Sequence, residues 1–140
     1  LRSRYMDEPI DAMIYCITVA LGFAALENAL FILSPINTGD ITKSVVTGNM
    51  RFIGATLVHL VSSASIGFMI GLAFYKNIFI KTIAIIAGVI LAVTLHASFN
   101  LSIINTTTID TLKVFVWVWI AIIILIILFE EIKVIKPKTI

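Results

Sequence analysis

The 140-residue sequence contains little charge and a single cysteine. Charged residues make up 13% of the chain, whereas about 25% is usual in soluble domains. The net charge of +2 is small and divided among several connections, which argues against a nucleic-acid-binding protein. Cys16 stands alone, so the sequence excludes an internal disulfide framework. We interpret Cys16 as a small buried residue.

Apolar residues dominate what is present. They make up 60% of the chain, and the mean hydropathy is +1.11. Four long apolar segments occupy residues 10–33, 52–75, 83–104 and 112–129. Each approaches the roughly 20 residues that a helix needs to cross a hydrocarbon core of ~30 Å. The sequence therefore predicts an all-α fold, a polytopic transmembrane helical bundle with four membrane helices. We expect residues 1–140 to form one domain of a longer protein.

The connections between these segments predict the orientation of the chain. Asn, Thr, Gly and Asp are concentrated in residues 36–44, which predicts a long polar loop after the first helix. The other side of the membrane receives the N-terminus, the turn at 76–81 and the C-terminal tail. That side carries more lysine and arginine: Arg2, Arg4, Lys76, Lys81, Lys133, Lys136 and Lys138, against Lys43, Arg51 and Lys113. The positive-inside rule therefore predicts cytoplasmic termini.

Three ionisable residues, Glu27, His59 and His96, interrupt three different apolar segments. At about 1.5 Å per residue, Glu27 lies ~10 Å below the outer end of its helix, and each histidine lies ~12 Å below. An ionisable side chain in lipid costs about 2.5 to 3.5 kcal/mol on insertion scales, so it survives mainly where it faces protein or water. Three such residues at one depth predict a shared site. Asn100 lies one helical turn above His96, on the same face.

Several chemistries fit a carboxylate and two imidazoles. Glu27, His59 and His96 can ligate a divalent metal such as zinc, or activate water as general acids and bases. Two alternatives from other classes stay open: a haem held between His59 and His96, and a proton or ion path along the three residues. A purely structural role as polar links between helices is the remaining interpretation.

Two other patterns indicate packing. Ser63, Gly67 and Gly71 form a stripe of small residues that lets a neighbouring backbone approach closely. Trp117 and Trp119 lie several residues inside the fourth segment, so we expect them to contact protein or lipid.

The order of motifs resembles the PrsW family of intramembrane proteases, which is related to the CAAX-processing and bacteriocin-immunity proteases. Residues 7–11 read DEPID and residues 22–28 read GFAALEN, and they are followed by Arg51, His59 and the HASFN segment at 96–100. The family pattern F-x-x-x-E falls on Phe23 and Glu27, and H-x-x-x-N falls on His96 and Asn100. The resemblance covers most of the chain, from residue 7 to residue 100.

The resemblance implies hydrolysis of a peptide bond in the plasma membrane of a prokaryote. The substrate would be a membrane-anchored protein such as an anti-sigma factor, cut near its extracytoplasmic side. In that family, by analogy with the wider superfamily, the histidines and the asparagine bind a metal or stabilise an oxyanion, and a glutamate activates water. On this chain Glu27, His59 and His96 would bind the metal or polarise the scissile carbonyl, and Asn100 would help to hold the oxyanion. The glutamate that activates water would be one in the missing motif described next.

One family motif is missing from its expected place. The family carries a Glu-Glu-x-x-Lys helix before the DEPID segment. The similar run Glu130, Glu131 and Lys133 has one residue, not two, between the second glutamate and the lysine, and it lies at the wrong membrane face. Either the motif lies upstream of Leu1, or the chain is a degenerate member. We therefore expect residues 1–140 alone not to cleave peptides.

Overall fold

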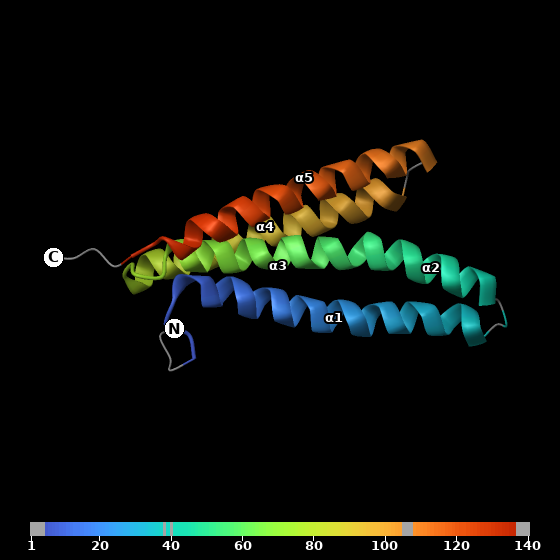
Figure 1. The fold of residues 1–140 in the computed structure, drawn as a ribbon, viewed down its shortest axis with the longest axis horizontal. Helices are drawn as coiled ribbons and strands as arrows, with labels where there is room; N and C mark the ends of the chain where they lie inside the picture. Colours follow the sequence, from blue (N-terminus) through green and yellow to red (C-terminus); the bar gives the residue numbers. More distant parts are fainter. Residues whose placement is uncertain (1–4, 38, 40, 105–107, 137–140) are drawn as a thin grey trace.

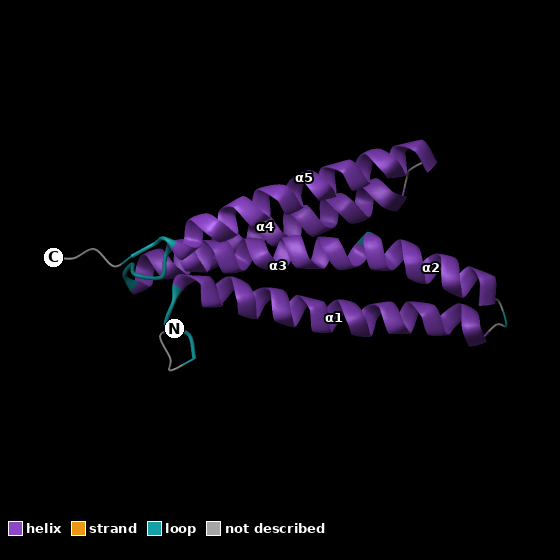
Figure 2. Ribbon diagram, in the orientation of Figure 1, coloured by secondary structure: helices purple, strands orange, loops and turns teal. Residues whose placement is uncertain are grey.

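The protein is a bundle of long helices (Figures 1 and 2). The computed structural model describes residues 5–37, 39, 41–104 and 108–136, and no strand occurs among them. The helices are α1 (Pro9–Asn37), α2 (Ile41–Ile53), α3 (Ala55–Leu72), α4 (Ile78–Ile104) and α5 (Thr108–Lys133). Four of them, all but α2, are long and apolar enough to cross a membrane. The predicted all-α, four-span fold class is confirmed.

The end of α1 and the start of α2 occupy most of residues 36–44, where the sequence predicted a loop, so the prediction of a long loop is wrong. The helix α1 continues to Asn37, and α2 begins at Ile41. Gly39 has a φ of +80°, the left-handed conformation that commonly ends a helix. Polar composition suggested a loop because α2 is amphipathic rather than apolar, so it lacks a membrane helix's signature. In Figure 1, α2 runs on nearly in line with α3 after a break at Gly54.

The helix α3 is central, since it contacts α1, α4 and α5. Its glycines allow α1 to approach closely, as the stripe of small residues predicted. A Cβ added at Gly67 would lie 2.5 Å from the Cα of Met13, and one added at Gly71 would lie 2.8 Å from the backbone oxygen of Pro9. Such distances are shorter than any van der Waals contact. The backbones of α1 and α3 therefore touch.

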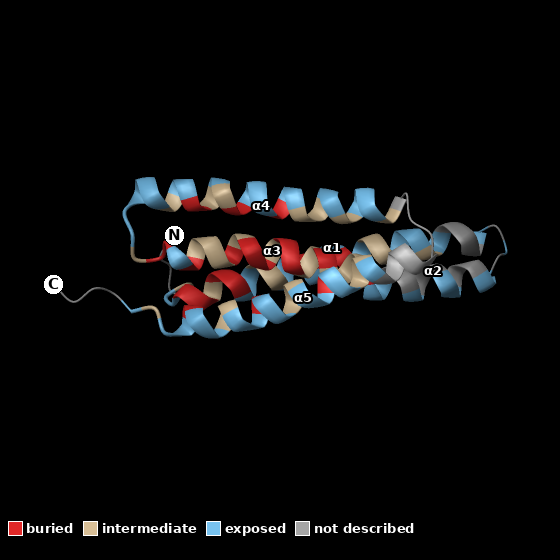
Figure 3. Ribbon diagram, turned by 90° about the horizontal axis from the view of Figure 1, so that it is seen from above, coloured by how far each residue is buried: buried red, intermediate tan, exposed pale blue. Residues whose placement is uncertain are grey.

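Burial follows the same contacts. In Figure 3 the buried residues lie mainly along α3 and on the faces of its neighbours that meet it, whereas the outward face of α4 is exposed. Many exposed residues are large and apolar, as expected where a helix meets lipid rather than water. The described ends of the chain, near α1 and α5, lie at the same end of the bundle (Figure 1). The predicted site lies away from this end.

Candidate active site

Glu27 and His59 meet across the contact between α1 and α3. Ala20 and Ala24 of α1 are buried against the bundle, and their small side chains let the two helices come close at this level. The His59 Nε2 lies 2.7 Å from the Glu27 Oε2, which is the distance of a charge-assisted hydrogen bond. The side chain of His59 is 11% exposed and that of Glu27 is 32% exposed. A polar pair is thus formed within the membrane-spanning part of the bundle.

The ring of His59 lies between two other rings. His96 of α4 packs against it with a centroid distance of 4.8 Å and an interplanar angle of 51°. Phe23, one turn before Glu27 on α1, packs edge-on at 5.2 Å and 71°. Both distances fall in the usual range for packed rings, roughly 4.5 to 7 Å. The structure therefore brings Glu27, His59 and His96 together, with His59 in the middle.

Asn28 and Thr56 form a second polar contact beside the first. Asn28 follows Glu27, and Thr56 lies three residues before His59, so the same two helices carry both contacts. The Asn28 Nδ2 donates a hydrogen bond of 2.9 Å to the Thr56 Oγ1. Among the described residues the buried Asn28 Oδ1 has no hydrogen-bond partner. Thr56 is not among the residues predicted from the sequence, although its position one helical turn from His59 was a usable signal.

Asn100 occupies a different environment. It lies on α4 one turn from His96, as its spacing predicted, but its side chain is exposed. Within the described residues no hydrogen bond joins Asn100 to the other three predicted site residues. The role predicted for Asn100 stays a prediction.

The metal site predicted for Glu27, His59 and His96 stays a prediction. Their donor chemistry suits zinc, which binds imidazole and carboxylate groups. However, no group of three His, Cys, Asp or Glu residues within the described part of the chain is arranged to hold a metal ion. The carboxylate of Glu27 bonds directly to His59, and the two imidazoles pack ring against ring. The observed arrangement is a hydrogen-bonded pair with a second imidazole beside it.

The haem alternative is not favoured by this geometry. A haem with two axial histidines needs the porphyrin iron between the rings. With centroids 4.8 Å apart, the rings of His59 and His96 are in direct contact and leave no space for a macrocycle.

The comparisons with known proteins agree with the motifs. A profile described as PrsW family intramembrane metalloprotease matches residues 1–128. No curated protein and no solved structure matches the chain. The matched residues include α1 to α4 and most of α5, together with all three members of the Glu27, His59 and His96 cluster. The chain therefore belongs to the PrsW family of intramembrane metalloproteases.

Proposed function

We propose that this chain carries the site of an intramembrane endopeptidase that cleaves membrane-anchored proteins, such as anti-sigma factors, near the extracytoplasmic face. The contact between Glu27 and His59 is the observation that supports it most directly. Hydrolysis of a peptide bond requires proton transfer and stabilisation of the negative charge that develops on the carbonyl oxygen. An imidazole held in place by a carboxylate can serve both needs.

In this proposal His59 polarises the scissile carbonyl, and Glu27 orients the ring of His59. Negative charge develops on the carbonyl oxygen as water adds to the carbon, and a hydrogen-bond donor at that oxygen lowers the barrier. With its Nε2 bonded to Glu27, His59 has its Nδ1 left to donate when the ring is protonated. The carboxylate of Glu27 balances the charge of that protonated ring. His96 packs against His59 and limits its rotation.

The remaining roles complete the hydrolysis. Asn100 donates its amide N–H to the oxyanion once the substrate lies beside α4. The attacking water loses a proton as it adds to the carbonyl carbon, and that proton is passed to the leaving amine as the C–N bond breaks. Membership of a metalloprotease family implies a metal ion. Glu27, His59 and His96 are the residues that would hold it, and a bound ion would polarise the scissile carbonyl or the attacking water.

The predicted topology supports a site near the extracytoplasmic face. The excess of lysine and arginine at the N-terminus, the α3–α4 turn and the C-terminal tail favours a cytoplasmic location for that end. The cluster would then lie about two helical turns below the opposite surface.

The test is cleavage of a membrane-anchored reporter by the intact protein. Glu27→Gln, His59→Ala and His96→Ala should each lower the rate by at least 100-fold, the typical contribution of general acid–base groups. Glu130→Gln is the matched control, because Glu130 pairs with Lys133 at the far end of α5. Full activity in all three site variants would refute the proposal. Residues 1–140 assayed alone test whether the water-activating group lies elsewhere.

The proton-path alternative is separated by the same variants. Liposomes containing the protein should show no Glu27-dependent proton flux. Flux that is lost in Glu27→Gln, together with no cleavage, would favour transport.

A further inference from the structure

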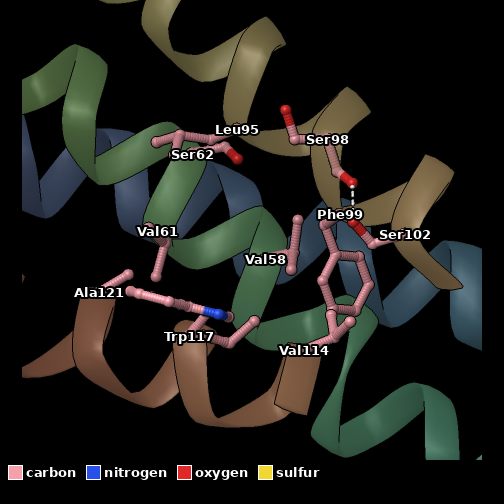
Figure 4. A pocket seen from close by; sticks show the side chains of 11 residues that line it. Val58, Val61, Ser62, Leu95, Ser98, Phe99, Ser102, Val114, Trp117 and Ala121 are labelled. Carbon is pink, nitrogen blue, oxygen red and sulfur yellow. Dashed lines mark hydrogen bonds between the residues drawn. The ribbon is translucent and has the colours of Figure 1, made fainter. Parts of the chain in front are cut away.

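A pocket of about 270 Å³ lies between α3, α4 and α5 (Figure 4). Its walls are mainly apolar, with Val58 and Val61 from α3, Phe99 from α4, and Val118 and Ala121 from α5, and serines of α3 and α4 complete them. A cavity of about 150 Å³ already accommodates a benzene ring in a protein core. The pocket can therefore hold a large apolar side chain together with part of the chain that bears it.

The pocket lies at the same level of the bundle as the histidine cluster. Val58 precedes His59 on α3, and Leu95 precedes His96 on α4, and both line the pocket. Successive residues of a helix point about 100° apart, so the pocket and the cluster occupy adjoining faces of α3 and α4. The α1 side of these helices carries the charged pair, and the α5 side carries the pocket.

Ser62 gives the pocket a polar group without a partner. Ser62 lines the pocket near Leu95 and Ser98 (Figure 4) and is 6% exposed. Its hydroxyl oxygen has no hydrogen-bond partner among the described residues. Ser65 and Ser102 differ, since each donates to a backbone oxygen of its own helix, at 2.6 Å and 2.7 Å. An unpaired hydroxyl at this depth favours an occupant that accepts a hydrogen bond.

Resting on the proposed protease function, we propose that this pocket binds an unwound segment of a membrane-spanning peptide substrate. The pocket takes one bulky apolar side chain, and the Ser62 hydroxyl donates to a backbone carbonyl of the same segment. A peptide bond in an intact helix has its carbonyl already bonded, so a segment must unwind before it is cut. Unwinding exposes carbonyls that require donors within the membrane. A lipid acyl chain fits the apolar walls but offers Ser62 no acceptor.

The pocket is open to the side of the bundle. Trp117 lines it from α5, yet the residue is 70% exposed. In a membrane that exposed side faces lipid, so a substrate helix can reach the pocket by lateral diffusion. Phe99 extends from α4 toward Val114 of α5 and bounds the pocket at one end (Figure 4).

Photo-crosslinking in liposomes tests the occupant directly. The probes are a synthetic transmembrane peptide of leucine and alanine, with a central Gly-Pro break that unwinds it and one benzophenone-bearing side chain beside the break, and palmitic acid with the same photo-reactive group. The peptide should crosslink to pocket residues of α5. Ala121→Phe should lower that yield at least fivefold by filling the pocket, and Ser62→Ala should lower it about fivefold, as the loss of one hydrogen bond implies.

The control for added bulk is Val116→Phe, on an exposed position of α5. It should leave the peptide yield unchanged, and circular dichroism should show the same helicity in all variants. Palmitic acid should crosslink at the pocket only weakly and without dependence on Ser62. Stronger capture of palmitic acid than of the peptide, or equal peptide yields in Ala121→Phe and Val116→Phe, would overturn the inference.

The two proposals fail in different ways. Peptide capture without cleavage by the intact protein would contradict the protease function and leave the pocket's ligand class standing. Reporter cleavage that is unchanged in Ala121→Phe, together with no capture of the peptide, would contradict the pocket assignment alone.

Discussion

The two sides of α3 are packed very differently. Toward α1 the backbones touch at Gly67 and Gly71, and polar side chains bond across the contact. Toward α5 the helices leave a pocket of about 270 Å³, lined by apolar side chains and three serines, of which Ser62 has a buried hydroxyl without a partner among the described residues. The contact with α4 is intermediate, since a Cβ added at Gly88 would lie 3.1 Å from the Cα of Ile66. The α1 side of α3 thus carries the tight backbone contact and, about two helical turns further along α3, the charged pair, whereas the α5 side is loosely packed.

This difference matches two needs of an intramembrane hydrolase. A carboxylate and an imidazole must be held within tenths of an ångström to share a proton, and close-packed backbones restrict their motion. A peptide substrate needs space that opens toward lipid, which a close-packed contact cannot offer. In the bundle the charged pair lies on the α1 side of α3 and the pocket lies on the α5 side.

The largest effect should follow from a methyl group at the tight contact. Gly67→Ala places a Cβ against the backbone of Met13, which no change of rotamer can relieve. We expect about 3 kcal/mol of destabilisation, at the upper end of overpacking costs, and loss of reporter cleavage. Unfolding in mixed detergent micelles measures the first, and the reporter assay measures the second.

Gly22→Ala is the matched control, because a Cβ there would meet nothing within 4 Å. It should keep full cleavage and gain slightly in stability, since alanine favours helix over glycine. Equal effects of the two substitutions would show that the α1–α3 contact is not tight.

A smaller effect is expected at the intermediate contact. In Gly88→Ala the new methyl group would lie 3.1 Å from the Cα of Ile66 and 3.2 Å from the Cβ of Met69. A shift of α4 by a few tenths of an ångström relieves this, so we expect about 1 kcal/mol of destabilisation. The same unfolding assay places it between Gly67→Ala and Gly22→Ala. A loss as large as that of Gly67→Ala would contradict the proposed gradient of packing.

The polar contact beside the charged pair should contribute less than the backbone contact. Thr56→Val removes the acceptor of the Asn28 amide and keeps the side-chain volume. Hydrogen bonds between membrane helices average about 0.6 kcal/mol, so we expect a loss of that size in unfolding measurements. Thr94→Val is the control, because Thr94 bonds only to the backbone oxygen of Ile90 within α4. Equal losses of stability in Thr56→Val and Thr94→Val would show that the hydrogen bond between α1 and α3 adds no stability of its own.

The sequence predicted which residues meet but not how they meet. The depth of Glu27, His59 and His96 follows from helix length and the rise per residue, so their convergence was predictable. Depth leaves the rotation of each helix about its axis undetermined. The direct bond between Glu27 and His59 depends on that rotation.

The missed features have separate physical reasons. The helix α2 was not predicted because its polar residues are typical of a loop when only the length of apolar segments is considered. The pocket was not predicted because nothing in the sequence distinguishes Val58, Phe99 and Trp117 from ordinary packing residues. A gap among them depends on how far α5 leans from α3, and residue type does not determine that angle.

The smallest effect should come from the exposed ion pair on α5, and it sharpens the comparison because it repeats the chemistry of the site. Lys133 Nζ lies 2.6 Å from Glu130 Oε1, with both side chains largely exposed. Exposed pairs contribute about 0 to 1 kcal/mol, so Glu130→Gln should change the free energy of unfolding by less than about 0.5 kcal/mol and leave cleavage intact. Glu27→Gln makes the same chemical change where α1 and α3 touch. If both substitutions lowered cleavage equally, the reaction would depend no more on the carboxylate between α1 and α3 than on one at the exposed end of α5. The position of Glu27 would then have no special role in the reaction.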